Sequence, residues 1–123
     1  MLTNLDLSAP NEIRLPLLWI GVLSGRLKAS LAASSGVQGV DDVIKYLLAG
    51  ADVVMTTSCL LKQGIGYLAT LLGGLKDWLS AREIETLDRV RGQLSQRNVA
   101  DPTAFERVNY IKILQGYEAK RID

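Results

Sequence analysis

The stretch from residue 27 to residue 58, LKASLAASSGVQGVDDVIKYLLAGADVVMTTS, decides the fold. Residues 27–33 alternate between apolar and polar side chains, and residues 52–58 are a short apolar run ending in hydroxyl residues, so each predicts a strand. Apolar residues between them follow helical spacing: Val40, Val43, Ile44, Leu47 and Leu48. A strand, a helix and a strand within about 30 residues form a βαβ unit with parallel strands. The sequence therefore predicts an α/β fold.

The predicted central helix has clear ends. Asp41 and Asp42 lie in its first turn, where the helix dipole favours negative charge, and Gly50 follows its last turn as a stop signal. The two aspartates could also be read as an acid–base pair. Their place at the helix start already explains them, so we interpret them as structural.

The flanking residues predict one continuous segment without a linker. Residues 1–15 are expected to be an irregular or extended lead-in, with a turn at Pro10-Asn11, and residues 16–80 to hold the βα units. The run from Leu15 to Leu23, at the start of this region, is apolar on every side. Periodicity alone therefore does not decide whether it is a buried strand or a buried helix. The C-terminal part, residues 81–123, is expected to be helical.

Helices are predicted at three further places. A strong amphipathic pattern covers Leu68 to Leu79, a weaker one covers Ile84 to Leu94, and Asp101-Pro102 is typical of an N-cap followed by a first helical proline. Trp19 and Trp78 stand among aliphatic residues and are expected in the core. The scattered basic residues, Lys62 among them, are expected on solvated helix faces.

Composition excludes several classes of function. The chain has 123 residues, a formal net charge of +1, no histidine and one cysteine. A nucleic-acid footprint is therefore not expected, nor is a zinc site or a Ser-His-Asp arrangement. The longest apolar run falls far short of the roughly 20 residues that a membrane helix needs. We expect a cytoplasmic protein without a metal site, in which Cys59 is a buried structural thiol.

Small polar residues follow both predicted strands. Ser34-Ser35-Gly36 comes after the first strand and Thr57-Ser58 ends the second. Because the carboxyl ends of parallel strands meet at one edge of the sheet, these loops could aim backbone N–H groups and hydroxyls at a phosphate. The same residues are also typical of plain tight turns, and their spacing alone does not separate the two interpretations.

Several segments in order resemble the last third of flavin-dependent dihydroorotate dehydrogenase-like proteins. They are residues 16–20, 28–37, 41–43 and 49–58, followed by 94–102, 105–107 and 109–111. The resemblance implies an FMN-binding (β/α)8 barrel that oxidises dihydroorotate to orotate in pyrimidine biosynthesis. It also implies that Pro16 to about Gly25 is the sixth helix of the barrel and Leu27 to Ala33 its seventh strand.

The same resemblance assigns the FMN phosphate to Ser35 and Gly36 in the first loop and to Thr57 and Ser58 in the second. The family's Gly-Thr-Gly-Gly is here Ala33-Ser34-Ser35-Gly36, so side chains stand where the family has glycines. The family's catalytic base, its pyrimidine-binding asparagines and the lysine near the flavin lie upstream of the matching region. None of these maps onto this chain, so we expect no catalytic residue here and no turnover by the isolated chain.

A complete barrel needs about 250 residues, so this chain would be its final part. The expected partner is then the missing N-terminal half of the barrel or a second copy of the chain. Two alternatives stay open. One is a stand-alone half-barrel that binds a phosphorylated ligand without redox chemistry, and the other is a remnant of an enzyme that binds no ligand.

Overall fold

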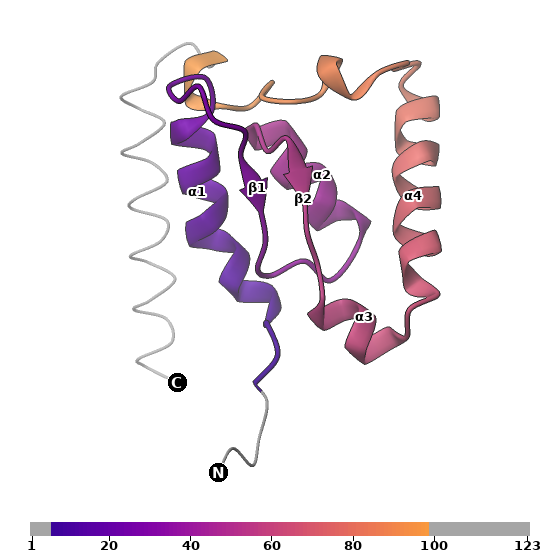
Figure 1. Cartoon of the computed structure of the whole chain (residues 1–123). Coiled ribbons are helices and arrows are strands. Elements are labelled where there is room, and N and C mark those ends of the chain that lie inside the picture. Colours follow the sequence, from indigo (N-terminus) through magenta and orange to yellow (C-terminus); the bar gives the residue numbers. More distant parts are fainter. Residues whose placement is uncertain (1–5, 99–123) are drawn as a thin grey trace, which may run out of the picture.

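The computed structural model, which describes residues 6–98, contains two short parallel strands (Figure 1). The helices around the strands account for most of the described chain. In order the elements are η1 (Pro10–Ile13), α1 (Arg14–Leu23), β1 (Ala32–Ala33), α2 (Val40–Ala49), β2 (Val53–Val54), α3 (Ser58–Gln63), α4 (Tyr67–Ala81), η2 (Leu87–Arg89) and η3 (Gln96–Asn98). In the view of Figure 1, the strands lie in front of α2, between α1 and α4. This mixture of helices with a small parallel sheet is an α/β arrangement, as predicted.

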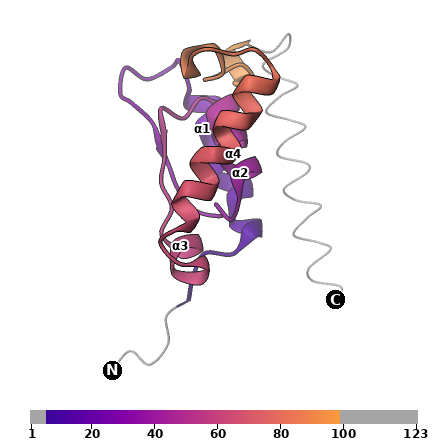
Figure 2. The same cartoon turned by 90° about the vertical axis from the view of Figure 1, so that its right-hand side faces the viewer.

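The βαβ unit is confirmed. Ala32 pairs with Val53 and Ala33 with Val54 in a parallel register, and α2 makes the connection between the strands. Seen from the side, the strands form one margin of the molecule and α1, α2 and α4 lie on the other side (Figure 2). No element of residues 6–98 covers the opposite face of the sheet, where Val53 is 53% exposed.

The core lies between the sheet and the helices α1 and α2. Its buried members come from η1, β1, the loop after β1, α2 and the lead into β2: Ile13, Ala33, Val37, Tyr46 and Ala51. Partly buried side chains of α1, α2 and β2 pack around them. Both loops that follow the strands are thus held against a packed layer.

Three helix predictions agree with the structure. The ambiguous run after Leu15 is the helix α1, as the resemblance implies, although α1 begins two residues before Pro16. The helix α2 ends at Gly50, whose φ of 122° lies outside the range that other residues adopt easily. The amphipathic pattern from Leu68 to Leu79 is the helix α4.

The predicted extents of the strands and of the lead-in are wrong. Pairing is confined to two residues of each strand, so residues 27–31 have no strand structure. Ser58 begins α3 instead of ending a strand. The predicted extended segment after Pro10 is the helical turn η1. Proline fixes a φ that suits a first helical residue, and the turn carries Ile13 into the core.

The predicted helix from Ile84 to Leu94 is also wrong. Only the short turn η2 forms there. The segment makes local turn bonds, and two of its N–H groups bond to the end of α2 rather than within a helix. The N–H groups of Gly92 and Leu94 donate to the carbonyls of Leu47 and Leu48, at 3.0 and 2.9 Å. The Leu47 carbonyl also accepts from the Gly50 N–H, and the bond from Leu94 gives the Leu48 carbonyl a partner at the helix end.

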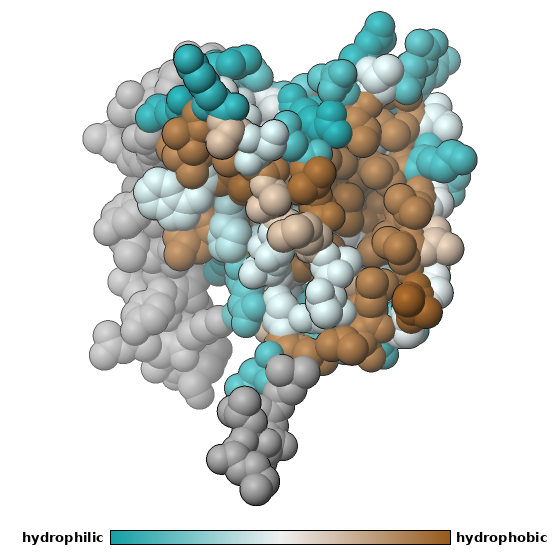
Figure 3. Space-filling view, viewed as in Figure 1, coloured by the Kyte–Doolittle hydropathy of each residue, from teal (hydrophilic) through white to brown (hydrophobic). Residues whose placement is uncertain are grey.

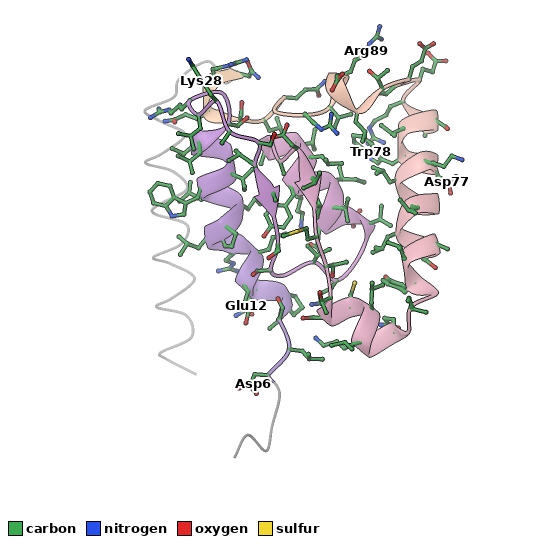
Figure 4. All side chains as sticks on the ribbon, viewed as in Figure 1. Asp6, Glu12, Lys28, Asp77, Trp78 and Arg89 are labelled. Carbon is green, nitrogen blue, oxygen red and sulfur yellow. The ribbon has the colours of Figure 1, made fainter. Side chains whose placement is uncertain are left out.

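The tryptophans are not both in the core. Trp19 is 52% exposed on α1, which contradicts the prediction. Trp78 is half-buried and lies on the inner side of α4, opposite Asp77 (Figure 4), with the Arg82 guanidinium 4.4 Å from its ring centroid.

The helix predicted after Asp101 lies outside the described residues. Among those residues, no helix has the length and hydrophobicity that crossing a bilayer requires.

Candidate functional site

The two loops that follow the strands meet at one cavity of about 280 Å³. All four residues predicted to bind phosphate line it: Ser35, Gly36, Thr57 and Ser58. Its other lining residues are Ser8, Ser34, Val37, Met55 and Thr56. The βαβ topology thus brings together loops that are separated by the whole of α2.

The first loop has an unusual backbone. Ser35 and Gly36 both have positive φ angles, 82° and 73°. A serine in this region costs roughly 1 kcal/mol or more, so surrounding contacts must hold the loop in this shape. The Gly36 N–H donates to the Ser8 hydroxyl at 2.7 Å, and Ser8 lines the cavity. The loop therefore directs a backbone donor at an oxygen in the cavity.

Tyr46 holds the first loop from behind. Its phenol hydroxyl lies 2.9 Å from the Ser34 carbonyl oxygen and 2.7 Å from the Ser35 carbonyl oxygen, so it donates to one or shares its proton between them. Burial, with a smaller contribution from the Asp42 carboxylate, raises the pKa of Tyr46 to about 12. The phenol is therefore protonated at neutral pH and can donate to these loop carbonyls.

Gly36 is also a packing position. A Cβ at residue 36 would overlap the backbone nitrogen of Ile13 and lie 2.6 Å from the Ile13 Cβ. No side chain fits between the loop and the start of α1. Gly36 thus fixes how closely α1 approaches the loop, in addition to offering its N–H group.

The second loop supplies hydroxyls. The Ser58 hydroxyl accepts a hydrogen bond from the Ser8 N–H at 3.0 Å. Within residues 6–98, the hydroxyls of Ser34, Ser35 and Thr57 make no hydrogen bond to the protein. These hydroxyls are free to serve a ligand.

The sequence analysis did not identify two residues that contribute to the site, Ser8 and Tyr46. Ser8 lies in the lead-in, 28 residues from Gly36 and 50 from Ser58, and no local pattern connects them. Tyr46 gave a signal, because a tyrosine amid the apolar residues of a helix usually needs a partner for its hydroxyl. Lys62 is exposed on α3, as predicted, and its ammonium also donates to the Ser8 carbonyl at 3.1 Å.

The residues interpreted as structural have structural contacts. Cys59 is buried, with its sulfur 3.0 Å from the Thr56 hydroxyl. The Asp42 carboxylate accepts from the Gln38 and Gly39 N–H groups, which caps the start of α2. Asp41 is exposed in the same turn.

Hydroxyl side chains and backbone groups make up most of the polar lining of the cavity. The described residues that line it include no carboxylate, thiol or amine. Asp6 and Glu12 lie at the end of the molecule where the loops after the strands meet, while Lys28 and Arg89 lie at the opposite end (Figure 4). The cavity volume is just below the range of about 300–1,000 Å³ for pockets that enclose a whole ligand. It suits one polar group of a larger molecule.

Comparison of the sequence with protein-family models and with curated proteins gave no match. The arrangement of the cavity and the resemblance described above are therefore what bear on function.

Proposed function

We propose that this chain binds the phosphate group of FMN in the cavity between residues 34–36 and residues 57–58. The observation that carries the proposal is the meeting of both loops around one cavity, with the Gly36 N–H directed at an oxygen there. Backbone N–H groups and hydroxyls at the carboxyl ends of parallel strands are a common phosphate-binding arrangement.

The residues present fit a phosphate. Free hydroxyls on both loops can donate to its oxygens, and the cavity accommodates the phosphate end of a nucleotide while leaving the rest outside. FMN, when bound, supplies the hydride-accepting flavin. In this proposal the chain's own residues hold the phosphate, and the catalytic groups belong to another part of the protein.

The wider assignment is the C-terminal part of a dihydroorotate dehydrogenase-like (β/α)8 barrel. Residues 6–98 contain a unit of the kind that such a barrel repeats, with parallel strands that carry α1, α2 and α4 on one face. In such barrels the phosphate site uses the loops after strands seven and eight, which is where the resemblance puts β1 and β2. The isolated chain is then expected to bind FMN without oxidising dihydroorotate.

Thr57→Val tests the site without disturbing the fold, because the Thr57 hydroxyl is exposed and has no partner within the described residues. FMN should raise the melting temperature of the wild-type chain, since a ligand of the native state stabilises it. Thr57→Val should weaken FMN binding about fivefold, the equivalent of one net hydrogen bond. Titration calorimetry measures the affinity.

Thr70→Val is the matched control, the same change on the exposed surface of α4. It should leave FMN affinity unchanged, and riboflavin, which lacks the phosphate, should bind neither protein. If FMN fails to stabilise the wild-type chain at any attainable concentration, the phosphate site is wrong and the remnant without a ligand is the better description.

One observation favours the half-barrel module as a second candidate. Val53 and Met55, 53% and 52% exposed, lie on the uncovered face of the sheet, and exposed apolar residues of α3 and α4 extend this surface (Figure 3). Contiguous apolar surface of this kind marks an interaction site. A second copy of the chain, or the other half of a barrel, would cover it.

Val53→Lys should therefore shift the chain from dimer to monomer, because a charge on this face cannot be buried without a partner. Light scattering measures the mass, and Thr70→Lys is the control. A monomeric wild-type chain would contradict self-pairing and leave the other half of the barrel as the partner.

A further inference from the structure

The oxygens of Ser8 are surrounded by donors from separate parts of the chain. Its hydroxyl accepts from the Gly36 N–H at 2.7 Å. Its carbonyl oxygen accepts from the Gln38 side-chain amide at 2.9 Å and from the Lys62 ammonium at 3.1 Å. The first two donors follow β1 and the third lies on α3, so three donors converge on one residue of the lead-in.

One of these contacts already uses a donor of the proposed phosphate site, the Gly36 N–H. Ser8 lines the same cavity as the two loops, and its own N–H donates to the Ser58 hydroxyl at 3.0 Å. While Ser8 is in place, the Gly36 N–H already has an acceptor. A phosphate that uses this N–H must replace the Ser8 hydroxyl.

We propose that Ser8 is an internal stand-in for two phosphate oxygens, and that a phosphate monoester displaces it and takes over the Gly36 N–H, the Gln38 amide and the Lys62 ammonium. The inference rests on the proposed phosphate site and adds to it two binding residues, Gln38 and Lys62, and a competitor. A dianion is a stronger acceptor for these donors than a hydroxyl and a carbonyl. Lys62 supplies the positive charge that the lining residues lack.

Displacement of Ser8 predicts how the affinity for a phosphate changes when the Ser8 hydroxyl is removed. Only molecules whose Ser8 has moved can bind, so the observed dissociation constant is raised by the rarity of that state. Removing the Ser8 hydroxyl should therefore tighten binding. If Ser8 were instead a fixed wall of the site, removing its hydroxyl would weaken binding or leave it unchanged.

The experiment compares Ser8→Ala with Ser80→Ala, an equivalent change on the exposed surface of α4. Calorimetric titration of the full chain uses two probes, inorganic phosphate and FMN. Ser8→Ala should bind both about fivefold more tightly than wild type, and Ser80→Ala should match wild type. Lys62→Gln should bind both several-fold more weakly, while Lys76→Gln on α4 should have no effect.

Hydrogen exchange at the Gly36 amide, followed by NMR, provides a readout that needs no ligand. This amide should exchange faster in Ser8→Ala than in wild type or in Ser80→Ala, because its acceptor is lost. Unchanged exchange would overturn the contact on which the inference rests.

The outcomes separate the two proposals. If wild type binds FMN and Ser8→Ala binds it equally or more weakly, displacement is wrong and the phosphate site stands. If neither wild type nor Ser8→Ala binds either probe, the proposed phosphate site is wrong, and so is the proposed displacement of Ser8. Tighter binding by Ser8→Ala together with weaker binding by Lys62→Gln supports both.

Discussion

Gly36→Ala is expected to lower the free energy of unfolding by about 4 kcal/mol, a large share of the roughly 5–15 kcal/mol of a typical domain. The φ angle of 73° costs an L-residue about 1–2 kcal/mol. The new Cβ would also overlap the Ile13 backbone, and forcing α1 away from the loop costs about 1–3 kcal/mol more. Urea unfolding of wild type and variant measures the difference.

Alanine substitutions at two other glycines separate the cost of the φ angle from the cost of close packing. Gly64 has a φ of 90° and a ψ of 157°, a region that glycine alone adopts easily, and a Cβ added there would meet no atom within 4 Å. Gly64→Ala should therefore lose only the conformational part, about 2 kcal/mol. Gly66 also has open space, and its φ of −61° is helical, so Gly66→Ala should cost nothing. Equal losses for Gly36→Ala and Gly64→Ala would contradict the close packing of α1 on the loop.

This packing decides which variants can test the site. The missing Cβ of Gly36 points at Ile13 and not into the cavity. A larger residue at position 36 would therefore abolish binding by disturbing the fold, whatever the cavity binds. Thr57, whose hydroxyl has no structural partner within the described residues, is the informative position.

The sequence predicted those parts of the fold whose causes are local. The helix α2 carries its apolar periodicity, its N-terminal aspartates and its stop at Gly50 within eleven consecutive residues, and the structure agrees. The convergence of the two loops was also predictable. It follows from a topological rule, because the carboxyl ends of parallel strands joined by a helix lie at one edge.

The errors concern contacts between distant residues. The segment predicted as a helix after Ile84 forms backbone hydrogen bonds to the end of α2, whose residues lie more than forty positions earlier in the sequence. The strands are shorter than their apolar runs because pairing needs a neighbour, and each has only one within the described residues. Ser8 joins the site for the same kind of reason, since its partners lie 28 to 54 residues away.

Tyr46→Phe is expected to lower the free energy of unfolding by about 2 kcal/mol at neutral pH. The change keeps the ring in the core but removes the hydroxyl next to the Ser34 and Ser35 carbonyls. The part-buried carbonyls are then left without this donor, which costs about 1–3 kcal/mol. Because the carbonyls then lose their restraint, the variant should also bind FMN more weakly. Urea unfolding and FMN titration measure the two effects.

Tyr67→Phe is the matched control, because the Tyr67 hydroxyl is half-buried and donates one bond of 3.2 Å to the Gln38 carbonyl. Its loss should be about 1 kcal/mol or less. If both variants lose the same amount, the phenol of Tyr46 is not the restraint that holds the first loop.

Alkaline titration tests the Tyr46 environment independently. In the unfolded chain Tyr46 releases its proton near pH 10.0, whereas burial raises its pKa in the folded chain to about 12. Between these values the unfolded state binds fewer protons than the folded state, so the stability of wild type falls as pH rises. The phenylalanine ring of the variant cannot titrate, so the advantage of wild type over Tyr46→Phe should shrink by about 2 kcal/mol between pH 10 and pH 12. An advantage that stays constant across this window would mean that the phenol ionises as easily in the folded chain as in the unfolded one, and that the first loop is open to water.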